Sequence, residues 1–175
     1  MEAKIIAITG PESTGKTTLA TQLAQHFGTV CLPDISRGYI DKIQRPYTCD
    51  DVYEIAREII AEETKALSLP HRFVFSDNCL LNIKIWLEFY GWHVPDWLIE
   101  HIQHSPVALY ILCDIDVEWQ KDNQRSNPDD REELLFRFMK ELTSFDKTYY
   151  LHSGLGEARL LGAVHIINNH FGLLV

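Results

Sequence analysis

Cysteine is scarce in this sequence, and its four cysteines, Cys31, Cys49, Cys79 and Cys113, are scattered along the chain. None of them forms a C-x-x-C pair, which argues against a metal ribbon or a dithiol redox site and favours reduced thiols. No apolar run approaches the roughly 20 residues that a membrane-spanning helix requires. Residues 1–4 lack the charged and then apolar pattern of a signal peptide, so we expect a soluble, cytoplasmic protein with no membrane partner.

Basic residues are outnumbered by acidic ones, and the net charge of −9 argues against a protein whose main task is to hold the nucleic-acid backbone. Internal repeats, low-complexity stretches and linker-like segments are also absent. A chain of 175 residues, of which 46 % are hydrophobic, can bury one core. We therefore expect a single domain over residues 1–175. The sequence does not indicate an oligomeric state.

The most informative stretch is residues 10–17, GPESTGKT, which fits the phosphate-binding pattern G-x-x-x-x-G-K-[ST] at every fixed position. A short apolar run rich in β-branched residues precedes it at 4–9, as in a buried parallel strand. Apolar residues at helical spacing follow over 17–27, and Gly28 is a plausible end of that helix. Strand, glycine loop and helix together predict a nucleoside triphosphate site.

The chemistry of such a loop assigns roles to its residues. Gly10 and Gly15 permit backbone conformations that turn successive N–H groups toward phosphate oxygens, and the helix dipole has its positive end there. Lys16 can reach the β- and γ-phosphates, and the Thr17 hydroxyl can coordinate Mg²⁺. The predicted contacts to ATP are Gly10, Pro11, Glu12, Ser13, Thr14, Gly15, Lys16, Thr17 and Thr18.

Two acidic residues follow further predicted strands. Asp34 comes after a strand at 29–32, and Asp77 ends an apolar strand at 72–77. Since ligands bind beyond the carboxyl ends of parallel strands, Asp34 could accept the proton of an attacking hydroxyl, and Arg37 could fix the acceptor. Asp77 has the form of a residue that holds Mg²⁺. The alternatives are helix caps at both aspartates and a solvated Arg37.

A capping box at residues 48–51 predicts a helix that extends to about Leu67. Tyr53 and Arg57 share one of its faces at i,i+4 spacing, where they either look into the acceptor cleft or simply pack. The next helix, 79–90, is apolar nearly all round, so Trp86 is expected in the core.

The clearest later strand, at 107–114, is followed by a polar segment that contains Arg125 and Arg131. Asn127 and Pro128 read as the start of a helix, so the segment resembles a lid whose arginines neutralise charge on the transferring phosphoryl group. The alternative is a solvated loop. A last strand at 149–152 and a terminal helix complete an α/β fold. We predict a P-loop three-layer αβα sandwich with a five-stranded parallel sheet and a short helical lid.

Taken together, these segments resemble the NadR-type ribosylnicotinamide kinase domain, a branch of the P-loop kinases. The resemblance is carried by ITGPESTGKTTLA at 8–20, by Asp34, Arg37 and Tyr39, and by the strand that ends at Asp77. Its most specific part is LCDIDVEWQ at 112–120, continued by Arg125 and Arg131 and, later, by Ser153, Gly154 and Arg159.

The resemblance implies ATP-dependent phosphorylation of the 5′-hydroxyl of nicotinamide riboside, which gives nicotinamide mononucleotide for NAD synthesis. Lys16, Asp34, Arg125 and Arg131 would be catalytic, Thr17 and Asp77 would hold Mg²⁺, and Asp116 would be structural. A separate adenylyltransferase would carry out the following step. Another nucleoside or nucleotide is the alternative acceptor, and a regulatory ATPase or GTPase switch is the alternative of another class.

Two departures from the family pattern concern the acceptor. Family members tend to carry Glu at the position of Asp34. They often have an aromatic residue just before it, where this chain has Pro33. Trp86, Trp119 or Tyr53 could replace that aromatic platform, and the sequence does not choose among them.

Overall fold

The computed structural model describes residues 2–120 and 130–173. In this part of the chain, five strands form one sheet in the order β2-β3-β1-β4-β5, and every neighbouring pair is parallel. The strands are β1 (Lys4–Thr9), β2 (Cys31–Leu32), β3 (Phe73–Asp77), β4 (Val107–Cys113) and β5 (Tyr149–His152). The predicted five-stranded parallel sheet is confirmed.

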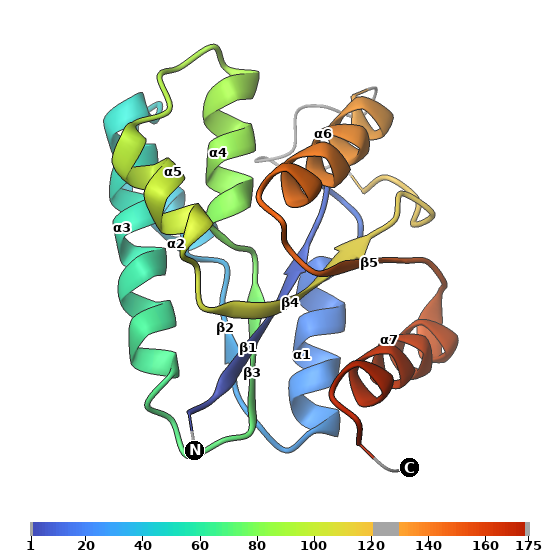
Figure 1. Cartoon of the computed structure of the whole chain (residues 1–175). Helices are drawn as coiled ribbons and strands as arrows, with labels where there is room; N and C mark the ends of the chain where they lie inside the picture. Colours follow the sequence, from blue (N-terminus) through green and yellow to red (C-terminus); the bar gives the residue numbers. More distant parts are fainter. Residues whose placement is uncertain (1, 121–129, 174–175) are drawn as a thin grey trace.

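Helices cover both faces of the sheet (Figure 1). One face carries α1 (Lys16–His26) and α7 (Gly156–His170). The other carries α2 (Ile35–Ile43), α3 (Cys49–Ala66), α4 (Leu80–Phe89), α5 (Asp96–Gln103) and α6 (Arg131–Ser144). The three-layer sandwich is therefore confirmed as well. None of the described helices is both long and apolar enough to cross a bilayer.

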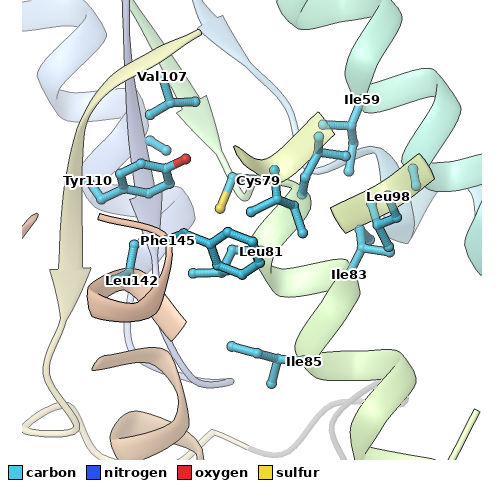
Figure 2. Packing of buried hydrophobic residues seen from close by; sticks show 14 of the residues in the cluster. Ile59, Cys79, Leu81, Ile83, Ile85, Leu98, Val107, Tyr110, Leu142 and Phe145 are labelled. Carbon is cyan, nitrogen blue, oxygen red and sulfur yellow. The ribbon is translucent and has the colours of Figure 1, made fainter. Parts of the chain in front are cut away.

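The core lies on both sides of the central strand β1, whose residues Ile5 to Ile8 are completely buried. Because successive side chains of a strand point to opposite faces, Ile5 and Ala7 join the cluster under α3–α6, while Ile6 and Ile8 join the cluster under α1 and α7. Figure 2 shows the larger cluster, in which α4 packs with β4 and the end of α6. Burial on both faces explains why β1 is apolar at every position rather than alternating.

Most predicted boundaries agree with the structure to within two residues. The capping box of α3 is present, since Thr48 and Asp51 each bond the backbone of the other. The helix cap given as the alternative for Asp34 is confirmed, since α2 begins directly after Asp34 and its side chain accepts a hydrogen bond from the Ser36 amide. The helix predicted to start at residues 127 and 128 is α6, which begins at Arg131 in the described chain; the two predicted starting residues lie outside the described ranges.

Candidate active site

The phosphate loop connects the central strand β1 to α1 at the carboxyl edge of the sheet. Gly10 has φ +134°, and a Cβ atom built there would lie 2.8 Å from the carbonyl oxygen of Cys113 at the end of β4. Gly15 caps α1 with φ +75°. Both glycines are therefore required by backbone geometry, one by the close approach of β4 and the other by the left-handed turn into the helix.

The loop forms one side of an open cleft of about 410 Å³. Every predicted nucleotide contact from Gly10 to Thr18 lines this cleft. Asp34, Arg37 and Asp77 line it too, so the structure brings the predicted phosphate, acceptor and metal residues together at one edge of the sheet. A cleft of this size is in the range that holds small-molecule ligands.

Lys16 points back along the loop, where its Nζ donates a hydrogen bond to the carbonyl oxygen of Pro11 at 2.7 Å. Burial lowers the pKa of this ammonium group, and the nearby Cys113, Asp77, Asp34 and Glu12 oppose that shift. The surrounding acids therefore help to keep a desolvated lysine charged, which is the state that phosphate oxygens require.

Asp77 is the best-placed metal ligand among the described residues. It is only 4 % exposed, and its Oδ2 has no hydrogen-bond partner. Burial raises the pKa of its carboxyl group, while the Thr17 hydroxyl and the Lys16 charge lower it. A buried carboxylate oxygen without a partner beside an exposed threonine hydroxyl suits Mg²⁺, which takes few protein oxygens and completes its shell with water and phosphate. Within the described ranges, no group of three His, Cys, Asp or Glu could hold a metal.

Asp34 both caps α2 and lines the cleft. Its carboxylate caps α2 by accepting a hydrogen bond from the Ser36 amide at 3.0 Å, and its Oδ2 lies 3.8 Å from Nε of Arg37. The same carboxylate lines the cleft. The cap fixes the side chain at the start of α2, so the capping and acceptor-facing interpretations are compatible.

Aromatic residues line the cleft together with the phosphate loop, and we call four of them the aromatic wall. They are Tyr47, Trp86, Phe89 and Tyr90. The rings of Tyr47 and Trp86 meet edge to face with centroids 5.1 Å apart, and the Tyr47 hydroxyl donates to that of Tyr90 at 3.0 Å. The prediction that Trp86 belongs to the core was wrong in part: the ring is partly buried against the core but also lines the cleft.

Tyr53 and Arg57 are not among the residues that line the cleft, which favours the packing alternative over the acceptor-facing one. The Tyr53 hydroxyl donates to the carbonyl oxygen of His93 at 2.7 Å, and the Arg57 guanidinium lies 5.2 Å from the centroid of the Trp97 ring. Both residues therefore contact α5 or the segment before it, while the Arg57 side chain is 53 % exposed. Tyr53 is not one of the aromatic residues that line the cleft.

Arg131 reaches the phosphate loop without lining the cleft. Its Nη2 donates to the carbonyl oxygens of Val117 at 2.9 Å and Ser13 at 3.3 Å, and its guanidinium lies 5.9 Å from the centroid of the Trp119 ring. Burial lowers the pKa of this guanidinium, and Asp116 opposes the shift. Trp119 therefore packs on an arginine. The second predicted lid arginine, Arg125, lies outside the described residues, as does most of the predicted lid.

Comparison with known proteins supports this interpretation of the fold. A family model described as an AAA domain matches residues 5–159. The chain belongs to this AAA domain family. A search of curated proteins finds no significant match.

Among solved structures, two NadR proteins are similar to this AAA domain chain. One, in complex with NR, has a TM-score of 0.78 and 19 % identity, covering 99 % of this chain and 53 % of NadR. The other, with NAD and AMP-PNP, has a TM-score of 0.74, 17 % identity, and coverage of 99 % and 51 %. A deoxyadenosine kinase from M.mycoides has a TM-score of 0.66 and 12 % identity, covering 94 % of this chain and 99 % of its own. The chain thus spans about half of NadR, and all three structures share the fold of this chain.

Sequence reasoning missed several residues of the site in this AAA domain. Tyr47, Phe89 and Tyr90 come from a loop and from the end of α4, and only the tertiary fold brings them to the cleft that the phosphate loop lines. Asn82 also lines the cleft, and its Oδ1 accepts a hydrogen bond from the Thr9 hydroxyl at 2.6 Å. The concentration of aromatics between residues 86 and 92 was the available signal, but apolar composition alone does not separate a core helix from a ligand wall.

Proposed function

We propose that this protein is an ATP-dependent kinase that transfers the γ-phosphoryl group to a nucleoside hydroxyl, with the 5′-hydroxyl of nicotinamide riboside as its preferred acceptor. The observation that carries the proposal is that the phosphate loop and the aromatic wall line a single cleft, with Asp34 and Asp77 among its lining residues. A phosphate donor and a flat-ringed acceptor could therefore meet within it.

Each part of the cleft has a chemical task in this proposal. The backbone N–H groups of the phosphate loop and the charge of Lys16 bind the triphosphate and stabilise negative charge during transfer. Thr17 and Asp77 would hold Mg²⁺, which supplies charge neutralisation on the phosphate oxygens when bound. Asp34 orients the acceptor hydroxyl and accepts its proton as its oxygen bonds to the γ-phosphorus, while the bond from that phosphorus to the β,γ-bridging oxygen breaks and ADP leaves.

The charge of the acceptor supports nicotinamide riboside over neutral nucleosides. The nicotinamide ring of this riboside is a pyridinium cation, and cations bind favourably to aromatic faces such as those of Tyr47 and Trp86. Three carboxylates, those of Glu12, Asp34 and Asp77, also line the cleft. Burial and the hydrogen bond with Tyr90 raise the pKa of Tyr47, and the Glu12 charge adds to that shift. The NadR structures, one in complex with NR and the other with NAD and AMP-PNP, support this pairing of acceptor and donor.

The test is release of ADP from Mg-ATP by purified protein, with and without a panel of ribosides. We expect strong stimulation by nicotinamide riboside, less by its uncharged reduced form, and a phosphorylated product detected by mass spectrometry. Stimulation only by another nucleoside would retain the kinase and discard this acceptor. Steady ADP release that no riboside changes would favour a regulatory ATPase instead.

A further inference from the structure

Arg159, in the first turn of α7, is a buried arginine that the proposed chemistry does not use. The residue is 6 % exposed, although arginine is among the residues least often buried. Its side chain reaches three separate segments. Nη2 donates to the carbonyl oxygen of Thr14 in the phosphate loop at 2.7 Å, and Nη1 donates to the carbonyl oxygen of Gly154 at 2.9 Å and to Oδ1 of Asp116 at 3.0 Å.

Asp116 holds the guanidinium in place from the loop that follows β4. The second carboxylate oxygen of Asp116 accepts a hydrogen bond from the Gly154 amide. Asp116 thus binds the N–H of Gly154 while Arg159 binds its carbonyl oxygen, and the two side chains also pair with each other. Gly154 has φ +121°, and a Cβ built there would lie 3.4 Å from Cα of Arg159. The main chain of Arg159 is fixed as well, since its carbonyl oxygen lies 2.8 Å from Nε2 of the buried His152.

The contact with Thr14 has a direct consequence for the phosphate loop. The peptide bond between Thr14 and Gly15 is trans, so the carbonyl of Thr14 and the N–H of Gly15 point in opposite directions. When Arg159 holds that carbonyl on the α7 side, the Gly15 N–H is turned away from α7, and Gly15 lines the cleft. Arg131 holds the preceding carbonyl, that of Ser13, in a comparable way.

We infer that Arg159 is a positioning residue: with Asp116 as its anchor, it fixes the Thr14–Gly15 peptide so that the Gly15 N–H is ready to bind a triphosphate oxygen. A loop that is already oriented loses less conformational freedom when ATP binds. The inference rests on the proposed function, because it concerns the ATP that the kinase would use. Arg159 and Asp116 would therefore support the binding of ATP through the phosphate loop. Neither side chain would touch the reacting atoms.

The experiment compares Arg159→Gln, Arg159→Lys and Asp116→Asn with the wild type. Calorimetry gives the Kd for Mg-ATP and, separately, for nicotinamide riboside, and amide hydrogen exchange reports on residues 14–17. The matched control is Arg137→Gln, which removes an exposed arginine paired with Glu133 on α6. A charge-assisted hydrogen bond is worth enough to predict a rise of at least about tenfold in the Kd for Mg-ATP in Arg159→Gln.

In support of the inference, Arg159→Gln and, more weakly, Asp116→Asn would lose affinity for Mg-ATP and exchange the Gly15 amide faster, while acceptor affinity stays within about twofold. Arg159→Lys, which restores one charged donor, would recover part of the loss. The inference is overturned if Arg159→Gln binds Mg-ATP as the wild type does, or if it loses both ligands equally through general unfolding. If the wild type binds no Mg-ATP, the proposed function fails. If the Gly15 amide exchanges at the same rate in Arg159→Gln as in the wild type, the positioning role of Arg159 fails as well.

Discussion

Asp34 and Asp77 follow neighbouring parallel strands at the same edge of the sheet, and the charge of Asp34 is one of the causes that raise the pKa of Asp77. In the register of β2 and β3, Leu32 lies opposite Ser76, so the two strands end side by side. Asp34 and Asp77 therefore line the same cleft. Their surroundings differ. Asp34 is held by the Ser36 amide, whereas one oxygen of Asp77 has no partner. This asymmetry suits a division of labour between an acceptor base and a metal ligand.

Asp34→Asn tests the acceptor base. The substitution keeps the shape and an oxygen that can still cap α2, but it removes the group that accepts the proton. We expect kcat to fall by roughly 10²–10⁴ while the Kd for Mg-ATP hardly changes. Steady-state kinetics and calorimetry measure the two quantities. An unchanged kcat would exclude Asp34 from the mechanism.

Trp86→Ala tests the aromatic wall. Loss of the ring removes a face that could stack on the acceptor, so KM for the acceptor should rise by about tenfold or more while KM for ATP stays nearly constant. Tyr53→Phe is the matched control, because Tyr53 is an aromatic residue bonded to His93 away from the cleft. Equal effects of the two substitutions on the acceptor KM would contradict this assignment of the wall.

Glu63→Gln tests a buried acid in α3. Glu63 is 2 % exposed, its Oε1 has no partner, and burial raises its pKa to about 7, with Lys147 opposing the shift. An acid whose folded pKa exceeds its unfolded value stays protonated in the fold, so the folded state loses stability as pH rises from about 4.5 to about 7. Glu63→Gln is always neutral and avoids this loss.

The variant should therefore be more stable than the wild type at pH 8, by up to about 3 kcal/mol, and nearly equal to it at pH 4.5. Urea unfolding at both pH values measures the difference, in which the contributions of the other titrating groups cancel. A stability difference that does not change with pH would show that Glu63 titrates normally in the folded protein.

Lys84→Met tests two ion pairs, one within α4 and one between α4 and α6. The Lys84 side chain is 8 % exposed, and its Nζ lies 2.6 Å from Oε1 of Glu88 and 2.7 Å from Oε2 of Glu141. Removal of the ammonium group leaves the largely buried carboxylate of Glu141 without its counter-charge, which should cost about 2–4 kcal/mol in the free energy of unfolding. Adding Glu141→Leu should restore most of that loss. Denaturant unfolding of the single and double variants decides between these outcomes.

The parts of the site that depend on local backbone chemistry could be predicted from sequence. The phosphate loop needs Gly10 and Gly15 for conformations and close approaches that other residues tolerate poorly, and Asp77 ends an unmistakably apolar strand. The acceptor side could not be predicted in this way. Helical spacing correctly placed Tyr53 and Arg57 on one face, but spacing does not say whether α5 or the cleft covers that face.

In the proposed kinase, donor binding and acceptor binding would use different stretches of the chain. The phosphate loop and its supporting contacts come from residues 10–18, 116 and 159, whereas the aromatic wall comes from residues 47 and 86–90. Substitutions in the loop before α3 and at the end of α4 can therefore change which ring is accepted without disturbing the machinery that handles phosphate. This separation would favour evolutionary change of substrate in the proposed kinase. Changes at a few aromatic positions would alter the acceptor and leave the residues that bind phosphate unchanged.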